Sequence, residues 1–360
     1  GWALAEGQIN AAREKNDDRL LHFWRQERSI VLRADKFSTV SDPQEKALIG
    51  ELALLGRLNR YTAAYTFAHA VPNAVNPYFL NPPAAPAGES LRGRIVPAEA
   101  FVVLWSGGFN SWTDVAALHE GLCSAMSENP SLHFVSTGGE IFGYDDKTYA
   151  DFQSRVAAGP HRDRFHLLGW VAMELLPLYY RQADLGLSMD GVNYETIFGA
   201  RNRINNMMAL GLAVATSRGT EISRVLEKEK LGLTFEPANA VALAQALAGA
   251  FGARGTLKSL GERGRQFVLE HWSPHRTTKP LQAWAERPSL APDNAERRRR
   301  APDQPDLLRI SLHPAEEIER LIEQVGDGPL RRALAAEQGR AGGLWRRIWG
   351  KLQRRDQDKT

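Results

Sequence analysis

The chain has 360 residues, of which 43% are hydrophobic and 24% charged, an ordinary composition that excludes a wholly disordered, collagen-like or coiled-coil chain. Its length favours about two domains. No apolar run approaches the roughly 18 residues of a membrane-spanning helix, and no secretory signal is visible. The single cysteine, Cys123, excludes an intramolecular disulfide and a cysteine-based metal site. It fits a reducing compartment, most simply the cytoplasm.

Charge is distributed unevenly along the chain. The net charge is +3, but residues 287–360 carry a net +4 and the rest of the chain a net −1. The basic character therefore belongs to the C-terminal tail. The nearly neutral body has no basic stripe of the kind that binds nucleic acid, so we expect no nucleic-acid partner.

The N-terminal segment, residues 11–70, predicts the order helix, strand, helix. Short β-prone stretches lie within Ser29–Val40. The Ser-Asp-Pro sequence at residues 41–43 is a helix-start signal, with a serine that can cap and a proline suited to the first turn. An apolar stripe with helical spacing follows it, at Leu48, Leu52, Leu55 and Leu58. Residues 71–98 then contain six prolines, which predict an extended linker or an irregular loop.

A regular alternation of strand and helix patterns begins at Phe101. Apolar runs of strand length occupy residues 101–105, 132–136, 165–168, 184–189, 212–216 and 233–235. Helical patterns occupy residues 113–127, 147–158, 171–182, 201–210, 223–230 and 238–251. This order predicts a parallel sheet with helices on both faces. Because the crossovers are right-handed, the loops that follow the strands lie along one edge of the sheet, where ligands bind.

Two segments at this edge have residues suited to a phosphate ligand. The loop Gly107–Asn110 enters a helix, so its backbone can approach a phosphate at the helix N-terminus. It is neither a GxGxxG fingerprint nor a P-loop. The second segment contains Glu195 followed by Arg201 and Arg203, whose forked donors suit a diphosphate. The alternative is that both arginines pair with acidic neighbours on a surface helix.

The order of several motifs resembles a known family. The upstream piece Ala34–Asn59 is similar to the last strand and helix of an acceptor domain, and residues 265–286 to a closing helix that returns to it. The other motifs are Leu104–Asp114, Leu167–Val171, Tyr180–Met189, Glu195–Glu221 and Leu231–Pro237. Together they resemble family-4 glycosyltransferases of the GT-B type, which have two facing Rossmann-like domains. The resemblance covers roughly residues 20–286 and implies a chain that lacks most of its N-terminal acceptor domain.

The resemblance also implies roles for particular residues. The loop after the first strand faces the donor diphosphate, the loop near residue 170 borders the nucleobase, and the helix start near residue 203 holds diphosphate and ribose. Glu195 lies near the donor sugar. The implied donor-binding residues are Gly107, Gly108, Asn110, Trp170, Val171, Glu195, Arg201, Arg203, Asn206, Thr220 and Glu221. No catalytic residue is assigned, and neither a metal ion nor a cofactor is expected.

This sequence departs from the pattern of the better-known family members. Gly108 and Thr113 occupy the places of an arginine and a lysine around the first loop. The usual pair of glutamates eight residues apart is absent, and Asn206 occupies the place of the ribose-binding glutamate. Arg201 and Arg203 are candidates to replace the lost cations. These departures leave the nucleotide unassigned.

The implied function is transfer of a sugar from a nucleotide diphosphate sugar to an unknown acceptor. Helix dipole, backbone N–H groups and arginines would neutralise the departing diphosphate without a metal ion, and the family implies retention of anomeric configuration. Two alternatives remain. The chain could be a non-catalytic scaffold or interaction protein that kept the fold, or a nucleotide-sugar epimerase of the same architecture.

The predicted organisation includes a basic tail. Its residues Leu344, Trp345, Ile348, Trp349 and Leu352 share one helical face, and five cations surround them within 344–355. This pattern favours an interfacial helix on an anionic membrane, with a lipid-linked acceptor and a peripheral location at the inner membrane face. The alternative is that the tryptophans pack onto the body or a second subunit.

The sequence predicts a division of the chain into six parts. They are an acceptor-domain remnant (1–72), a Pro-rich linker (73–100), a nucleotide-sugar-binding Rossmann-like domain (101–274), a closing helix (275–286), a linker (287–310) and the basic helical tail (311–360).

Overall fold

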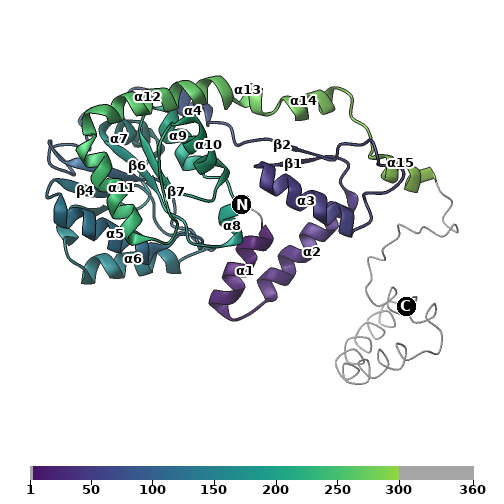
Figure 1. Cartoon of the computed structure of the whole chain (residues 1–360), viewed down its shortest axis with the longest axis horizontal. Helices are drawn as coiled ribbons and strands as arrows, with labels where there is room; N and C mark the ends of the chain where they lie inside the picture. The colour runs from purple at the N-terminus through teal and green to yellow at the C-terminus, as the bar shows by residue number, and fades with distance from the viewer. Residues whose placement is uncertain (1–2, 300–360) are drawn as a thin grey trace, which may run out of the picture. The chain divides into compact units, whose positions relative to one another are not determined.

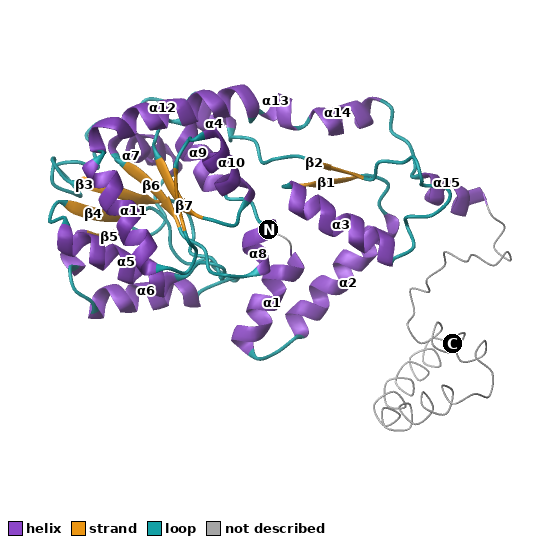
Figure 2. Cartoon of the chain, viewed as in Figure 1, coloured by secondary structure: helices purple, strands orange, loops and turns teal. Residues whose placement is uncertain are grey.

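The computed structural model describes residues 3–299. Its main feature is a six-stranded parallel sheet in the order β5-β4-β3-β6-β7-β8, shown in Figures 1 and 2. The strands are β3 (Phe101–Trp105), β4 (Leu132–Ser136), β5 (Phe165–Leu167), β6 (Leu185–Ser188), β7 (Val214–Ser217) and β8 (Leu233–Phe235). The prediction of a Rossmann-like α/β fold is confirmed.

Helices cover both faces of this sheet, because its central strands are apolar on both sides. Every residue of β3 is buried, as expected for a parallel strand between two helix layers. One face is covered by α5 (Val115–Glu128), α6 (Lys147–Ala158) and α11 (Ala240–Gly252). The other face is covered by α4 (Pro77–Leu80), α7 (Leu176–Gln182), α9 (Asn202–Ala209), α10 (Glu221–Glu229) and most of α12 (Arg254–His271).

The N-terminal segment is a smaller α/β unit whose elements differ from the prediction. Helix α1 (Ala3–Glu14) was not predicted, and α2 (Asp18–Arg33) includes the first residues of the segment expected to be strand. Only β1 (Phe37–Thr39) is extended there, and it pairs in parallel with β2 (Ala68–Ala70). Tertiary packing decides this boundary, since Val31 and Leu32 of α2 are buried.

The predicted start of the next helix is confirmed. Helix α3 (Asp42–Leu54) begins after Ser41, whose side chain accepts a hydrogen bond from the Gln44 amide. Proline lies in the first turn, where its missing N–H costs nothing. The apolar stripe is shorter than predicted, because the helix ends at Leu54 and Leu58 lies beyond it, 47% exposed.

The proline-rich segment 73–100 packs against the sheet instead of spanning solvent. It contains α4, and its side chains Phe79, Leu91 and Val96 are buried in the core. The ring of Phe79 stacks on Tyr180 of α7, with centroids 5.5 Å apart. Of the two interpretations, the irregular loop describes this segment better than a linker.

The C-terminal end of the described chain also differs from the prediction. The closing helix expected at 265–286 is divided into the end of α12, α13 (Pro274–Thr277) and α14 (Lys279–Glu286), with a proline in the first turn of each of the last two. A linker was expected at 287–310, but part of this segment forms the helix α15 (Pro292–Arg299). Asp293 of α15 is fully buried and forms an ion pair with the equally buried Arg57.

Three further short elements complete the described chain. They are η1 (Arg162–Arg164), η2 (Met173–Leu175) and α8 (Tyr194–Phe198). Within residues 3–299, no helix is both long and apolar enough to cross a bilayer. The predicted tail, including residues 344–355, lies outside the described residues, and the domain boundaries stay predictions.

Candidate functional site

A cavity of about 460 Å3 opens at the carboxyl edge of the sheet, beside the loop that follows β3. The strand order reverses between β3 and β6, so the loops after these two strands lead to opposite faces of the sheet. Open α/β sheets bind ligands at this switch point. The cavity is lined by Phe79, Ser106, Gly107, Asn110, Trp112, Met173, Leu176, Tyr180, Ala200, Arg201, Asn202, Arg203 and Asn206.

The glycine-rich loop after β3 forms one wall of this cavity. Gly107 has φ +89°, a conformation that favours glycine. The neighbouring loop after β4 approaches so closely that a Cβ on Gly138 would overlap the Gly107 carbonyl. Phe109 holds the loop from behind, because it is buried and stacks on Trp105 with centroids 4.9 Å apart. The loop is therefore a rigid backbone surface.

Arg203, in the first turn of α9, reaches across the cavity to this loop. Its guanidinium lies 4.6 Å from the ring centroid of Trp105, and Nη2 donates to the Gly108 carbonyl at 2.7 Å. Nη1 is buried and has no hydrogen-bond partner among the described residues. Nor does any carboxylate in residues 3–299 form an ion pair with Arg203. Burial lowers the pKa of Arg203 to about 10, so the side chain is still a cation at neutral pH.

Arg201 has carboxylate partners on two sides. Its Nε donates to Asp190 at 2.9 Å, and Nη2 and Nη1 donate to the two oxygens of Glu195 at 2.6 and 3.2 Å. All three side chains are almost completely buried. Burial alone would lower the pKa of Arg201, but the two carboxylates outweigh it and raise that pKa. The alternative interpretation, pairing with acidic neighbours, is thus correct for Arg201, although the pair is buried.

Asn206 and Asn110, two of the residues predicted to bind the donor, also line the cavity. The Asn206 side-chain oxygen accepts a 3.4 Å hydrogen bond from the backbone amide of Asn76, in the proline-rich segment. The buried neighbour Asn205 donates to the Asn73 carbonyl at 2.8 Å. These contacts attach the proline-rich segment to α9 beside the cavity.

Other predicted residues lie outside the cavity lining. Trp170 is 62% exposed and donates to the Glu140 carbonyl at 2.7 Å, while Val171 packs on the core. Glu195 is fully buried, so its carboxylate faces Arg201 and not the cavity. Thr220 caps α10 by accepting from the Ser223 amide. Burial, followed by the charge of Asp42, raises the pKa of Glu221.

Sequence reasoning did not single out several of the lining residues. Tyr180 is buried, and its hydroxyl is 2.6 Å from the Ser106 hydroxyl, so these two side chains close one end of the cavity. Trp112 packs on the Arg201 guanidinium at 5.1 Å. Phe79 comes from the proline-rich segment. Tyr180, Ser106 and Trp112 belong to matched motifs, but Phe79 has no local signal because only tertiary packing brings it to the site.

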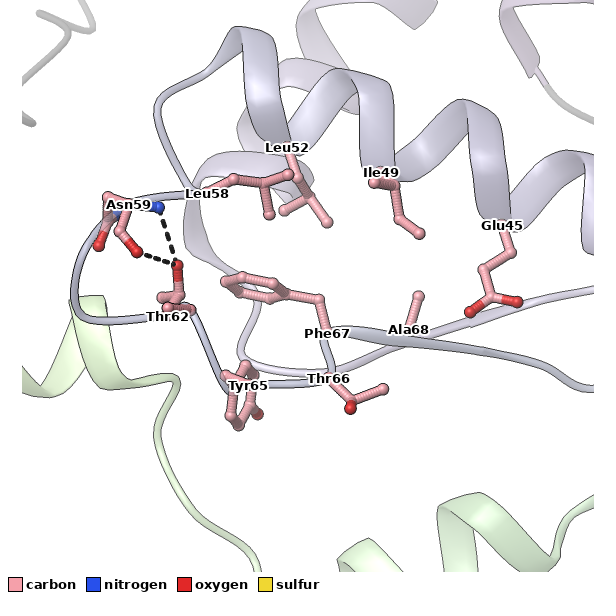
Figure 3. Close-up of a pocket in the computed structure, with 11 residues that line it drawn as sticks. Glu45, Ile49, Leu52, Leu58, Asn59, Thr62, Tyr65, Thr66, Phe67 and Ala68 are labelled. Atoms are coloured by element: carbon pink, nitrogen blue, oxygen red, sulfur yellow. Dashed lines mark hydrogen bonds between the residues drawn. The ribbon is translucent and has the colours of Figure 1, made fainter.

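A second cavity, of about 290 Å3, lies between α3 and β2 in the N-terminal unit (Figure 3). Its walls are mainly apolar, with Ile49, Leu52 and Phe67 among them. The Thr62 hydroxyl accepts a hydrogen bond from the Asn59 backbone amide at 3.0 Å and donates one to the Asn59 carbonyl at 3.2 Å. This cavity contains no predicted site residue. Residues 3–299 contain no group of three or more His, Cys, Asp or Glu side chains that could hold a metal ion.

Fold and cavity together define a doubly wound α/β domain, in which backbone, a helix N-terminus and an arginine converge at the switch point of the sheet. Residues 100–251 match the family model described as glycosyl transferases group 1.

Similar solved structures agree on the fold. One is sucrose-phosphate synthase from Thermosynechococcus elongatus, with a TM-score of 0.59 and 20% identity over 79% of this chain and 66% of the other. Another is HepE of Anabaena in complex with UDP and glucose, with a TM-score of 0.59 and 15% identity over 74% and 68%. A third is the UDP-forming trehalose-phosphate synthase of Burkholderia vietnamiensis, with a TM-score of 0.53 and 13% identity over 74% and 61%.

These similarities show the GT-B type of architecture and no more than the fold. The chain spans about two thirds of the length of the sucrose-phosphate synthase that it resembles. No curated protein sequence matches the chain.

Proposed function

We propose that this chain is a glycosyltransferase that binds a nucleotide diphosphate sugar in the cavity between the Gly107 loop and α9. The observation that carries the proposal is Arg203, a half-buried cation in the cavity wall whose Nη1 is buried without a hydrogen-bond partner and which has no carboxylate partner among the described residues. Burying a charge without a counter-charge is costly. A diphosphate in the cavity would supply that counter-charge and accept from the unpartnered Nη1.

The proposed chemistry is stabilisation of the departing diphosphate. The first amides of α9 have no partner within the helix and lie at its positive end, beside Arg203. Negative charge grows on the diphosphate as the bond to the sugar breaks, so fixed donors there lower the barrier. This supports transfer without a metal ion. Retention of anomeric configuration is proposed from the family resemblance, and no general base is named.

The donor is proposed to be a uridine diphosphate sugar. The HepE structures contain UDP or UDP-glucose, and the trehalose-phosphate synthase is described as UDP-forming. For this chain, we propose that the exposed Trp170 borders the base. We further propose a carbohydrate acceptor. From the sequence of residues 344–355, we also propose that the acceptor is linked to a lipid. In this proposal the chain binds peripherally to the inner face of an anionic membrane, and its body lies in the cytoplasm.

Calorimetry with UDP, GDP and ADP tests the donor site. We expect UDP to bind most tightly, and Arg203→Gln to weaken UDP more than uridine. Arg254→Lys is a matched control, because Arg254 pairs with Asp184 near the amino ends of β3 and β6, at the opposite edge of the sheet. If the folded chain binds none of the three diphosphates, the donor site is refuted.

Turnover separates the enzyme from its alternatives. We expect release of UDP from a UDP-sugar, to water or to an added sugar, that persists in a metal chelator. The burial of Glu195 against Arg201 favours the scaffold alternative, which predicts UDP binding without turnover. An epimerase would instead release a free epimer.

Sedimentation with anionic and neutral vesicles tests the membrane proposal. The proposal fails if the chain does not bind anionic vesicles at low salt.

A further inference from the structure

Arg201 is attached to three loops at the carboxyl edge of the sheet. Its guanidinium binds Asp190, after β6, and Glu195, on α8. Asp190 also accepts a hydrogen bond from the hydroxyl of Ser217, at the end of β7. The ring of Trp112, in the loop after β3, packs on the guanidinium. Arg201 therefore joins the segments that follow β3, β6 and β7.

Few of the donors of Arg201 remain for a ligand. A guanidinium has five N–H groups. One binds Asp190, two bind Glu195, and the second hydrogen of Nη1 points to the Ala200 carbonyl at 3.4 Å. Its charge is already compensated by two carboxylates. Arg203, in contrast, uses one described side-chain hydrogen bond, to Gly108.

The backbone of Arg201 begins the helix that presents Arg203. Arg201 is the residue before α9, and its carbonyl accepts from the Ile204 amide at 2.9 Å. Its side chain therefore anchors the first turn of α9 to Asp190 and Glu195. Arg203 lies in that turn, with its guanidinium between Trp105 and the Gly108 carbonyl. A shift of the first turn would move this guanidinium out of the cavity wall.

The sequence leaves space for this anchor at Gly199. A Cβ at this position would overlap Glu195 Oε1 and Arg201 Nη1. The backbone of Gly199 has φ −76°, which any residue can adopt. The requirement for glycine is therefore steric and comes from the buried ion pair alone.

We propose that Arg201, anchored by Asp190 and Glu195, is a positioning residue that holds Arg203 against the donor diphosphate and does not itself bind the donor. This inference rests on the proposed donor site. It replaces the sequence-based expectation that both arginines bind the diphosphate.

A double-mutant cycle measured by calorimetry with UDP tests the proposal. We expect Arg201→Lys and Gly199→Ala each to weaken UDP binding about 10-fold, and Arg203→Gln to weaken it about 10- to 100-fold, as for loss of hydrogen bonds to a charged group. In the Arg203→Gln background, the other two substitutions should cause no further loss, because they act through Arg203. If the losses multiply, Arg201 acts on the donor directly or independently and the proposal is overturned.

A second measurement needs no ligand. The Trp105 ring should shift the side-chain NMR signals of Arg203, which are assigned by their absence in Arg203→Gln. We expect this shift to collapse in Gly199→Ala and Arg201→Lys. It should persist in Gly249→Ala, whose added Cβ on α11 meets nothing within 4 Å. Gly199→Ala keeps every charge, so it serves if Arg201→Lys does not fold.

The two measurements distinguish failure of the inference from failure of the proposed function. If the wild-type chain does not bind UDP, the donor site fails, and the NMR shift then decides alone whether Arg201 positions Arg203. A shift of Arg203 that survives both Gly199→Ala and Arg201→Lys overturns the positioning role whatever the UDP result.

Discussion

The surroundings of Arg201 and Arg203 differ, although the two residues lie two positions apart at the start of α9. Arg201 is enclosed by Asp190 and Glu195 and packs against Trp112. Arg203 has an aromatic ring and one carbonyl as neighbours, and one of its nitrogens is buried without a partner among the described residues. The Arg201 cation is thus compensated by two carboxylates, whereas the Arg203 cation has no carboxylate partner within residues 3–299. The comparison teaches that spacing and residue type do not separate a structural cation from a ligand-binding one.

The largest effect is expected from removing Arg201, the cation that two buried carboxylates surround. Arg201→Ala would leave two carboxylates buried without their counter-charge, which should lower the free energy of unfolding by about 3–5 kcal/mol. Chemical denaturation at neutral pH measures this. The control Arg155→Ala removes an exposed ion pair with Asp151 and should cost less than about 1 kcal/mol. A similar small loss for Arg201→Ala would contradict the assignment of the triad as structural.

For Arg203 we expect the opposite result, a small effect on stability and a large effect on ligand binding. Arg203→Gln removes a cation that has no counter-charge in the described part of the chain, so the free energy of unfolding should change by less than about 1 kcal/mol, the size of its contact with Trp105. Binding of UDP should weaken by about 1.5–3 kcal/mol. Denaturation and calorimetry on the same sample give both numbers. A stability loss as large as that of Arg201→Ala would end the distinction between the two arginines.

Glu51, a half-buried carboxylate on α3, differs from both arginines because its neighbour Glu27 carries a charge of the same sign. Burial and the charge of Glu27 raise the pKa of Glu51 to about 7. Because the folded pKa exceeds the unfolded value, the stability contributed by protonated Glu51 is complete below about pH 4.5 and is lost between pH 4.5 and 7.

Glu51→Gln should therefore remove part of the pH dependence of stability. With allowance for solvent screening, we expect the variant to gain about 1 kcal/mol over the wild type between pH 5 and pH 8. Thermal or chemical unfolding at both pH values measures the difference. The reverse sign, a wild type that gains relative to the variant as pH rises, would show that Glu51 is ionised in the folded chain throughout.

The smallest effect concerns the proposed base contact. Trp170→Ala should weaken UDP binding by about 1 kcal/mol through loss of an aromatic contact, and it should leave pyrophosphate binding unchanged. Competition between the two ligands measures this by calorimetry. Equal weakening of UDP and pyrophosphate would instead place Trp170 at the diphosphate.

The sequence predicted the parts of the fold that depend on local pattern. The alternation from Phe101 to Phe251 is confirmed, and so is the cap at Ser41, because apolar periodicity and capping act within a few residues. The strand expected within Ser29–Val40 forms only at β1 (Phe37–Thr39), because burial of Val31 and Leu32 extends α2 over the first part of that segment. The helix α15 was missed because its buried Asp293 is stabilised by Arg57, more than two hundred residues away.

The sequence by itself determined the α/β architecture, the edge at which a ligand can bind, and the segment of the candidate site that includes Arg201 and Arg203. Only the tertiary structure decided which arginine is enclosed by carboxylates and which faces the cavity. It also decided that Phe79 of the proline-rich segment reaches the site and that Glu195 does not. The physical reason is the separation in sequence of the residues that interact. Strand and helix patterns are set by neighbours along the chain. The state of a buried charge depends on partners contributed by several loops, which meet only when the sheet is assembled.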